Sequence, residues 1–430
     1  MPILGEFLAP YSAVTCLILL IVTLILFATE VFKSGITAVA CGIVMVICGF
    51  ITTAEFTSGF SNTVTLFCLG IAVVGTAFAE TGCAAFLAKK LLSKVNFSEK
   101  GLVVALFAVI AFMSAFLNNT SCVVIGIYLS MAICQASGGK YKMRNFLMPM
   151  GIAGVCGGGV SMIGSTTQLS IAALLPDLGF EMKMWDLAKP GLIVPIIFIL
   201  WYYFFGYNIM AKTFDFPEPE GMGEVSSAAL KEFDPKNIKG WIPAIILIGC
   251  IALTLKGWNI AVVGMMGMCL VIMCGCISFK RAVETTDWNV FFLIAGGVGF
   301  ANGVRNAGTA EMLANGVVRI LGNASPVVYL IFFTLLCAIM TNIMTNIGTA
   351  LVMAPIGIAV AQAAGFSAYP LLLCIIWGAN MPYSTPVGAS PITMTMMAGY
   401  RFKDYTRVNI IPNIVVAVVL AVLTPMFWPL

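Results

Sequence analysis

The stretch TNIMTNIGTA (residues 341–350) interrupts one of the most apolar parts of the chain. It lies between LIFFTLLCAIM and LVMAPIGIAV, two runs that are apolar enough for the interior of a lipid bilayer. Two asparagines and three threonines within these ten residues are costly there, because their polar groups need hydrogen-bond partners. A chain keeps such residues where they are buried against other protein groups or face a water-filled cavity.

The composition of the 430-residue chain is that of a membrane protein. Apolar residues make up 60% of it and charged residues 9%, whereas about a quarter of the residues of a soluble domain are charged. Runs of about 20 apolar residues recur, and each is long enough to cross a bilayer core of about 30 Å. The sequence therefore predicts an all-α polytopic membrane protein and not a barrel of short alternating strands.

Apolar runs and polar interruptions divide the chain into two similar halves. We expect an extra N-terminal helix in residues 1–34 and a first repeat over residues 35–210. A polar linker, residues 211–239, connects it to a second unit over residues 240–430, which opens with another extra helix.

Each half contains one segment that is predicted to be a re-entrant hairpin and one that is predicted to be a broken transmembrane helix. The hairpins are expected at about 102–136 and 326–364. The broken helices are expected at 145–175 and 369–398.

Three unrelated landmarks recur at nearly one spacing. The pairs and their offsets are Asn119 with Asn346 (227), Gly82 with Gly308 (226) and Gly164 with Ala389 (225). The halves are therefore internal repeats. Since five membrane elements, one of them re-entrant, make each repeat, the two repeats are predicted to be inverted. Inverted repeats are typical of transporters that hold their substrate between the repeats near the middle of the membrane.

Charge placement predicts the orientation. If the hairpins enter and leave on one side, most of the 22 basic residues lie on one side of the membrane. The remaining ones lie on the other side and are Lys183, Lys189, Lys256, Arg305 and Arg319. The positive-inside rule places the larger group in the cytoplasm. We therefore expect a multi-pass protein of the inner or plasma membrane, with both termini outside and the linker in the cytoplasm.

Four polar interruptions occupy matching places in the two repeats. They read FLNNTSC, GSTTQ, TNIMTNIGT and YSTPVGASP. Each is predicted to end one half-helix and begin another, which presents backbone N–H groups to an anion and carbonyl oxygens to Na⁺. Helix packing by small residues explains any one of them but not four in register. None contains a group that titrates near neutral pH, which favours metal-ion coupling over proton coupling.

A literal Ser-Asn-Thr triplet, residues 61–63, lies outside these interruptions, and its register partner is Asp-Trp-Asn at 287–289. We interpret the triplet as a helix cap at the membrane interface. The chain contains no histidine, and its 14 cysteines are scattered through apolar runs. We therefore expect no zinc site, no organic cofactor and no nucleic-acid partner. An intramembrane enzyme is disfavoured, because it needs a nucleophile with a base or a metal set.

At the hairpin tips the chain resembles the divalent anion sodium symporter family, within the larger ion transporter superfamily. That family carries one Ser-Asn-Thr motif at each tip. Here the motifs read Asn-Asn-Thr at 118–120 and Thr-Asn-Ile at 345–347, so that both asparagines are kept and the second threonine is lost. The hydroxyl residue that lies near each motif in the family's sodium sites is matched by Ser114 and by Thr341.

The resemblance implies an elevator-type homodimer, in which a mobile transport domain moves past a scaffold domain and binds Na⁺ before a dicarboxylate. The implied substrate residues are Asn119, Thr120, Asn346, Ser165, Thr166, Ser390 and Pro391. The implied ligands of one Na⁺ are Ser114, Asn118, Asn119 and Gly164. Those of a second Na⁺ are Thr341, Asn346, Ala389 and the carbonyl of Met344.

The sequence therefore predicts Na⁺-coupled symport of a small divalent anion, with a C4-dicarboxylate such as succinate as the first choice. Sulfate, a sulfonate or another oxyanion stays open, because the tip motifs are altered. A Na⁺-independent dicarboxylate exchanger also stays open, although Ser114 and Thr341 argue against it. A channel has no need of inverted, broken repeats around one closed site.

Overall fold

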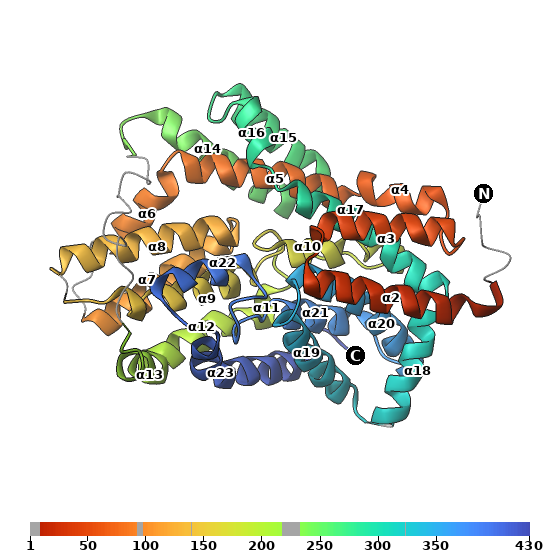
Figure 1. Ribbon diagram of the computed structural model, residues 1–430. Helices are drawn as coiled ribbons and strands as arrows, with labels where there is room; N and C mark the ends of the chain where they lie inside the picture. The colour runs from red at the N-terminus through yellow and green to blue at the C-terminus, as the bar shows by residue number, and fades with distance from the viewer. Residues whose placement is uncertain (1–8, 93–97, 139, 217–232, 323) are drawn as a thin grey trace.

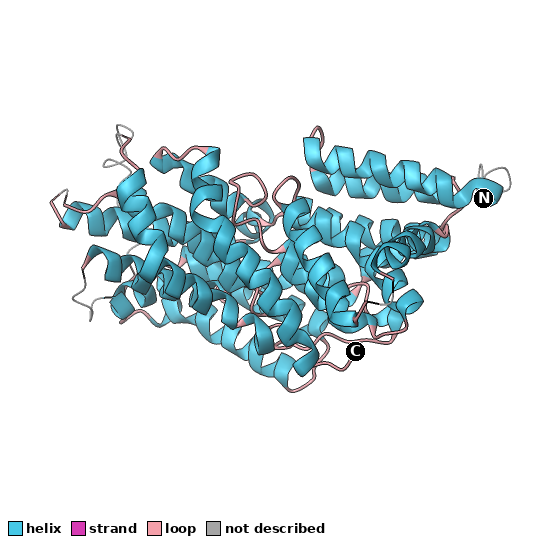
Figure 2. Ribbon diagram, turned by 90° about the horizontal axis from the view of Figure 1, so that it is seen from below, coloured by secondary structure: helices cyan, strands magenta, loops and turns pink. Residues whose placement is uncertain are grey.

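The computed structural model describes residues 9–92, 98–138, 140–216, 233–322 and 324–430, and these residues form helices and no strand (Figures 1 and 2). By length and composition, six of the described helices can cross a membrane, or up to seven if one bent pair counts as a single span. Shorter apolar helices of 10–17 residues accompany them. The predicted all-α polytopic membrane fold is confirmed.

The helices of the two halves follow one another in the same order. Those of the first half are α2 (Ser12–Thr29), α3 (Ser34–Ile47), α4 (Thr53–Ser61), α5 (Thr63–Glu80), α6 (Cys83–Leu92), α7 (Glu99–Ser114), α8 (Asn119–Ala136), α9 (Leu147–Gly158), α10 (Thr166–Ala172), α11 (Ala188–Gly191), α12 (Ile193–Trp201) and α13 (Tyr207–Thr213). Those of the second half are α14 (Ile238–Leu255), α15 (Ile260–Met273), α16 (Phe279–Thr285), α17 (Trp288–Asn306), α18 (Thr309–Leu321), α19 (Pro326–Thr341), α20 (Asn346–Ala364), α21 (Ala368–Ala379), α22 (Ser390–Thr393) and α23 (Phe402–Leu423). Residues 217–232 of the predicted linker lie outside the described residues.

Four pairs of helices at equivalent places in the two halves have equal lengths. α2 and α14 have 18 residues each, α3 and α15 have 14, α7 and α19 have 16, and α9 and α21 have 12. The starts of α2 and α14 are 226 residues apart (238 − 12), as are the starts of α3 and α15 (260 − 34). α2 and α14, the helices that the sequence pattern set apart as extra, thus keep the same spacing as α3 and α15.

Two helix crossings of the same design join the repeats. α5 of the first repeat packs on α15 of the second, and α3 packs on α17. A Cβ on Gly70 would lie 2.2 Å from the carbonyl carbon of Gly264 in α15. A Cβ on Gly296, which lies 226 residues after Gly70, would be 2.6 Å from the backbone nitrogen of Val39 in α3. Glycine at both crossings lets the helix backbones touch. This close approach maximises the dispersion contacts between the helices, which matter because the hydrophobic effect does not drive helices together inside a lipid bilayer.

The broken helices exchange their second halves between the repeats. α7 and α8 pack on each other and on α9, and α19 and α20 pack on each other and on α21. α10 packs on α20 and α21 of the second repeat as well as on α5 of the first, whereas α22 packs on α8 and α9 of the first repeat. In Figure 1, α10 accordingly lies at the centre of the molecule, between the α7–α9 group and the α19–α21 group. That each helix pair is re-entrant in the membrane stays a prediction.

Replacing Gly70 by alanine should push α5 away from α15, because the new methyl group overlaps the backbone of Gly264. We expect Gly70→Ala to lower the free energy of unfolding by about 1–3 kcal/mol, although alanine is the better helix former. Thermal unfolding of the purified protein in detergent measures this. Gly75→Ala in the same helix is the control, since no atom lies within 4 Å of its added Cβ. Equal melting temperatures of the two variants would contradict the packing argument.

Candidate functional site

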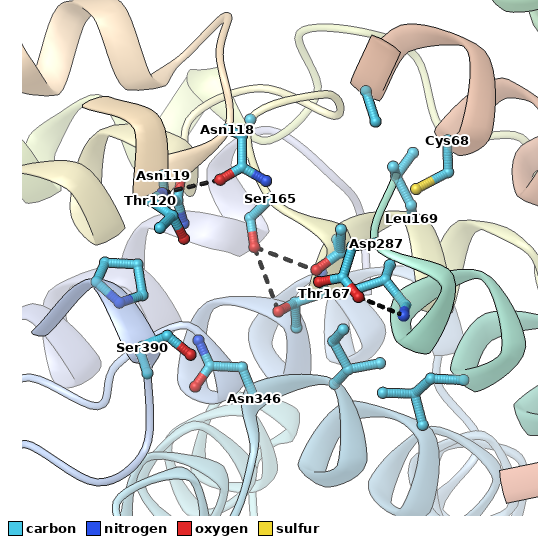
Figure 3. Close-up of a pocket in the computed structure, with 18 of the residues that line it drawn as sticks. Cys68, Asn118, Asn119, Thr120, Ser165, Thr167, Leu169, Asp287, Asn346 and Ser390 are labelled. Atoms are coloured by element: carbon cyan, nitrogen blue, oxygen red, sulfur yellow. Dashed lines mark hydrogen bonds between the residues drawn. The ribbon is translucent and has the colours of Figure 1, made fainter. Parts of the chain in front are cut away.

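A cavity of about 240 Å³ lies where the four polar interruptions meet (Figure 3). Residues of every interruption line it, together with one face of α5 and the first residues of α3 and α17. Four helices of 14 residues or more, α3, α8, α17 and α20, begin at this cavity. Helix N-termini carry unpaired N–H groups and the positive end of the helix dipole, which together favour an anion.

The structure brings the predicted substrate residues together. All of them line the cavity, namely Asn119, Thr120, Asn346, Ser165, Thr166, Ser390 and Pro391. Of the predicted Na⁺ ligands, the cavity is lined by Asn118, Asn119, Gly164, Asn346 and Ala389. Ser114, Thr341 and Met344 lie behind the tips and are buried, with exposures of 0%, 0% and 8%. The roles of these residues stay predictions.

The first hairpin tip gathers oxygen atoms around Asn119. Oγ of Ser114 lies 2.9 Å from Oδ1 of Asn119 and 2.6 Å from the carbonyl oxygen of Gly154. The same end of the Asn119 amide lies 2.8 Å from the carbonyl oxygen of Gly164. An amide nitrogen turned toward these oxygens donates to them, whereas an amide oxygen completes a group of oxygens that a cation must stabilise. The amide nitrogen in this place satisfies the three oxygens, whereas the amide oxygen in this place makes a set of oxygen ligands that fits Na⁺.

The second tip repeats the arrangement. Oγ1 of Thr341 lies 2.7 Å from Oδ1 of Asn346 and 2.7 Å from the carbonyl oxygen of Ala379. Since a hydroxyl has one hydrogen, it can donate to only one of the two oxygens at a time. Thr341 therefore leaves an excess of oxygen lone pairs at the second tip. At the first tip the same excess arises only when the Asn119 amide turns its oxygen toward Ser114.

Buried amides bridge the two broken helices. Nε2 of Gln168 in α10 donates to the carbonyl oxygens of Gly158 and Ser161 at 2.7 Å and 3.0 Å, where α9 ends. Nδ2 of Asn380, the C-cap of α21, donates to Oε1 of Gln168 at 3.0 Å. Oδ1 of Asn380 accepts from Oγ of Ser165 at 3.1 Å. Gln168 and Asn380 are 0% and 2% exposed, so this network joins the repeats through buried side chains.

The half-helices α10 and α22 begin with the same backbone geometry. Their N-caps are Ser165, with φ −142°, and Ala389, with φ −145°. A glycine, Gly164 or Gly388, precedes each cap. A Cβ added to Gly164 would lie 2.8 Å from the carbonyl oxygen of Ser114, the last residue of α7. A Cβ added to Gly388 would lie 1.9 Å from that of Thr341, the last residue of α19. The two N-caps are therefore 224 residues apart (389 − 165), whereas the sequence pattern paired Gly164 with Ala389 at 225. The spacing differs because the break between α9 and α10 and the break between α21 and α22 differ in length.

The sequence pattern did not indicate the part of the site at the starts of α3 and α17. Ser34 and Asn289 line the cavity there. Oδ1 of Asn289 accepts from the backbone nitrogen of Gly35 at 2.7 Å, and its Nδ2 donates to Oγ of Ser34 at 3.3 Å. Only the tertiary structure brings these residues, 255 positions apart, to the hairpin tips.

The triplet at 61–63 and its register partner both cap helices. Oδ1 of Asn62 accepts from the backbone nitrogen of Val64 at 2.9 Å, as a helix cap should. Oδ1 of Asp287 likewise accepts from the backbone nitrogen of Val290 at 3.3 Å. However, Asp287 also lines the cavity, where it is the only aspartate, glutamate, lysine or arginine among the described lining residues. The argument against proton coupling rested on the four interruptions alone and does not extend to Asp287.

Removing either amide of the bridging pair should leave one buried polar atom of the other, Oε1 of Gln168 or Nδ2 of Asn380, without its partner. We expect Asn380→Ala and Gln168→Ala each to lower the free energy of unfolding by about 1–3 kcal/mol. The double variant should lose less than the sum of the two by about 0.5–2 kcal/mol, because the side chains interact directly. Thermal unfolding in detergent measures all three. Asn208→Ala, which removes an exposed amide from α13, is the control, and strict additivity would contradict a direct bond.

The chain is similar to known transporters along most of its length. It is 24% identical over 418 residues to an uncharacterized transporter of Haemophilus influenzae, which covers 94% of this chain and 89% of that protein. It is 21% identical over 416 residues to the sodium-dependent dicarboxylate transporter SdcS of Staphylococcus saprophyticus, which covers 86% of this chain and 78% of SdcS.

A solved structure has a similar fold. The YdaH transporter of Alcanivorax borkumensis superposes with a TM-score of 0.62 at 17% identity, over 98% of this chain and 99% of that chain. The family described as CitMHS, citrate transporter, matches residues 24–368 and again residues 250–429. The resemblance to sodium-coupled divalent-anion transporters is thereby confirmed, and the protein is a transporter rather than an enzyme. Since the match spans far more than half of its length, the chain belongs to the CitMHS family of citrate transporters.

Proposed function

We propose that the protein is a secondary active transporter that carries a small divalent anion, a C4-dicarboxylate such as succinate, together with Na⁺. One observation carries this proposal: two equivalent hairpin tips present Asn119 and Asn346 to a single cavity. Among the described residues that line it, none is a lysine or arginine. An anion in such a cavity has to be held by amides, hydroxyls, helix N-termini and bound cations.

The neutral groups of the cavity suit a dicarboxylate. α8 and α20 begin at Asn119 and Asn346, so that each tip offers one amide side chain and one positive helix end. Two carboxylates a few carbon atoms apart can each take one tip. Hydroxyls of Ser165, Thr166 and Ser390 line the same cavity and can complete the hydrogen bonds.

Na⁺ supplies the positive charge that the side chains lack. The excess of oxygen atoms beside Thr341 supports one ion behind the second tip, and turning the Asn119 amide oxygen toward Ser114 makes an equivalent site behind the first. Two such ions offset the two charges of the substrate, and they link its binding to the Na⁺ gradient. The similarity to a protein described as a sodium-dependent dicarboxylate transporter supports the same coupling.

Alternating access follows from the inverted repeats. The cavity includes the first residues of α3 and α17 but none of the described residues at the other ends of these helices, so it opens toward one side. Exchanging the conformations of the two repeats opens the site to the opposite side. We propose that this occurs as an elevator motion within a homodimer, in which the unit that carries both tips moves past α3, α5, α15 and α17.

Succinate uptake into proteoliposomes tests the transport proposal. With Na⁺ outside we expect saturable uptake that choline does not support. We expect Asn119→Ala and Asn346→Ala each to lower it more than tenfold, because each removes the amide that one hairpin tip presents to the cavity. Asn208→Ala is the matched control, since this exposed asparagine lies on α13. Uptake that is equal in Na⁺ and choline but requires internal dicarboxylate would indicate an exchanger, and inhibition by sulfate without succinate uptake would indicate an oxyanion carrier.

The tip hydroxyls should act on Na⁺ more than on the substrate. We expect Thr341→Ala to raise the half-saturating Na⁺ concentration roughly tenfold, in line with the loss of one charge-assisted contact. Thr341→Ser keeps the hydroxyl and should restore the wild-type value. The Na⁺ dependence of uptake at saturating succinate measures both variants. A Na⁺ dependence that is the same in Thr341→Ala and in the wild type would contradict an ion site at this tip.

A further inference from the structure

Among the described residues that line the cavity, Asp287 is the only aspartate, glutamate, lysine or arginine. Its side chain is exposed, and Figure 3 shows it across the cavity from Asn119 and Ser390, toward Cys68 and Leu169. A carboxylate in this place repels a dicarboxylate, so the role of an ordinary substrate ligand does not explain it.

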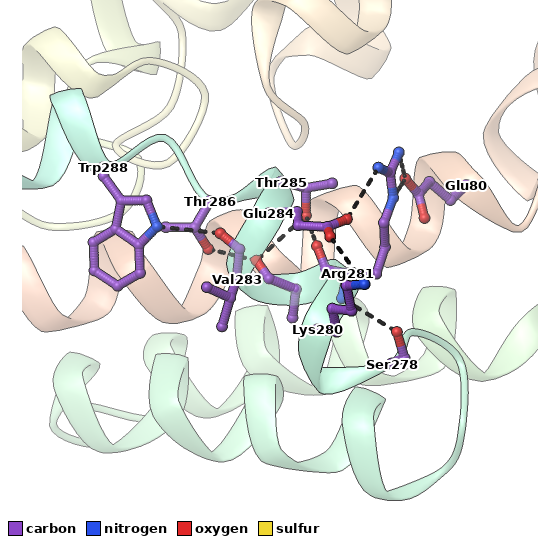
Figure 4. A network of polar contacts seen from close by, with 10 residues as sticks. Glu80, Ser278, Lys280, Arg281, Val283, Glu284, Thr285, Thr286 and Trp288 are labelled. Carbon is purple, nitrogen blue, oxygen red and sulfur yellow. Dashed lines mark hydrogen bonds and ion pairs between the residues drawn. The ribbon is translucent and has the colours of Figure 1, made fainter.

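The charge of Asp287 is not neutralised by the basic residues on the neighbouring helix α16. Arg281 turns away to Glu80, with an N–O distance of 2.7 Å, and also approaches Glu284 at 3.8 Å (Figure 4). Lys280 lies 4.0 Å from Glu284. Among the described residues no ion pair involves Asp287, and therefore its field acts on the cavity.

The equivalent position of the other repeat carries no charge. Asn62 caps α5 as Asp287 caps α17, but it is a neutral amide. Nδ2 of Asn62 donates to the carbonyl oxygen of Ala173 at 3.0 Å, and Asn62 is not among the described residues that line the cavity. If the two repeats exchange roles when the site opens to the other side, Asn62 takes the place of Asp287. The two openings of the pathway then differ by one negative charge.

We propose that Asp287 lowers the affinity for the anion on one face of the pathway. Its charge weakens anion binding in the conformation described here and so favours release of the substrate on this face. The inference rests on the proposed transport of an anion. This face carries Lys33, Lys280 and Arg281, and the charge distribution predicts that it is cytoplasmic. At separations of about 10 Å in a partly hydrated cavity, one unit charge acting on a dianion changes affinity roughly three- to tenfold.

Asp287→Asn removes the charge and keeps the helix cap, since asparagine caps helices as well as aspartate does. The local potential can be measured without any substrate. A cysteine at Gly75, which lines the cavity and has no atom within 4 Å of an added Cβ, is labelled with an anionic and with a cationic methanethiosulfonate reagent. The background carries alanine at the cavity-lining Cys68, and labelling of that background without the new cysteine is subtracted.

We expect Asp287→Asn to raise the ratio of the anionic to the cationic labelling rate roughly three- to tenfold at low salt, and less at high salt because salt screens the charge. Glu284→Gln is the matched control, because it removes a carboxylate from α16 that does not line the cavity. The ratio should not change in this control. An unchanged ratio in Asp287→Asn would overturn the proposal.

Succinate transport from each face then tests the consequence. In inside-out vesicles we expect Asp287→Asn to lower the half-saturating succinate concentration roughly three- to tenfold, and in right-side-out vesicles we expect little change. A change that is equal at both faces, or absent from both, would overturn the proposal. If the wild type carries no succinate at all, the proposed dicarboxylate transport fails. The labelling ratio alone then decides whether Asp287 controls the potential of the cavity.

Discussion

The structure depends on one constraint, which is that a backbone polar group in an apolar environment must have a hydrogen-bond partner. Breaking a helix inside the membrane exposes several such groups at once. The second break shows how they are satisfied. The side chain of Asn342 donates to the carbonyl oxygens of Ala338 and Met381 at 2.6 Å and 3.2 Å and accepts from the backbone nitrogen of Ser384 at 3.2 Å. At the first break, Gln168 has the corresponding task.

These bonds also bring the four interruptions to one place. A half-helix can end inside the protein only where other polar groups form hydrogen bonds with its free backbone groups. The other broken segments are the main source of such polar groups. Gln168 and Asn380, which belong to different repeats, bond to each other and to the ends of α9 and α10. The need to satisfy the breaks therefore gathers the four interruptions around one cavity, and polar residues of all four line it.

The repeat gives the molecule two copies of each hairpin tip and of each helix cap, and the residues of the two copies can differ. Ser114 and Thr341 occupy equivalent places and make equivalent contacts with a backbone carbonyl and with the asparagine of the tip. The caps Asn62 and Asp287 both hold a helix start but differ in charge, because a cap requires only a suitable oxygen. Because either asparagine or aspartate can cap a helix, the side chain at such a position can change its charge in one repeat only. It can thereby acquire a second role on one side of the membrane.

The sequence by itself determined the helical membrane fold, the repeat and the residues of the four interruptions, since hydropathy, spacing and polar residues in apolar runs are local properties. The family resemblance of the sequence also pointed to seven residues as a substrate site, and all seven line the cavity. Only the tertiary structure decided that Ser34, Asn289 and Asp287 share that cavity, and that Asn380 bridges to Gln168 across the repeats. Those contacts join residues more than two hundred positions apart. They depend on how α3 packs on α17 and α10 on α21, and no local pattern encodes that packing.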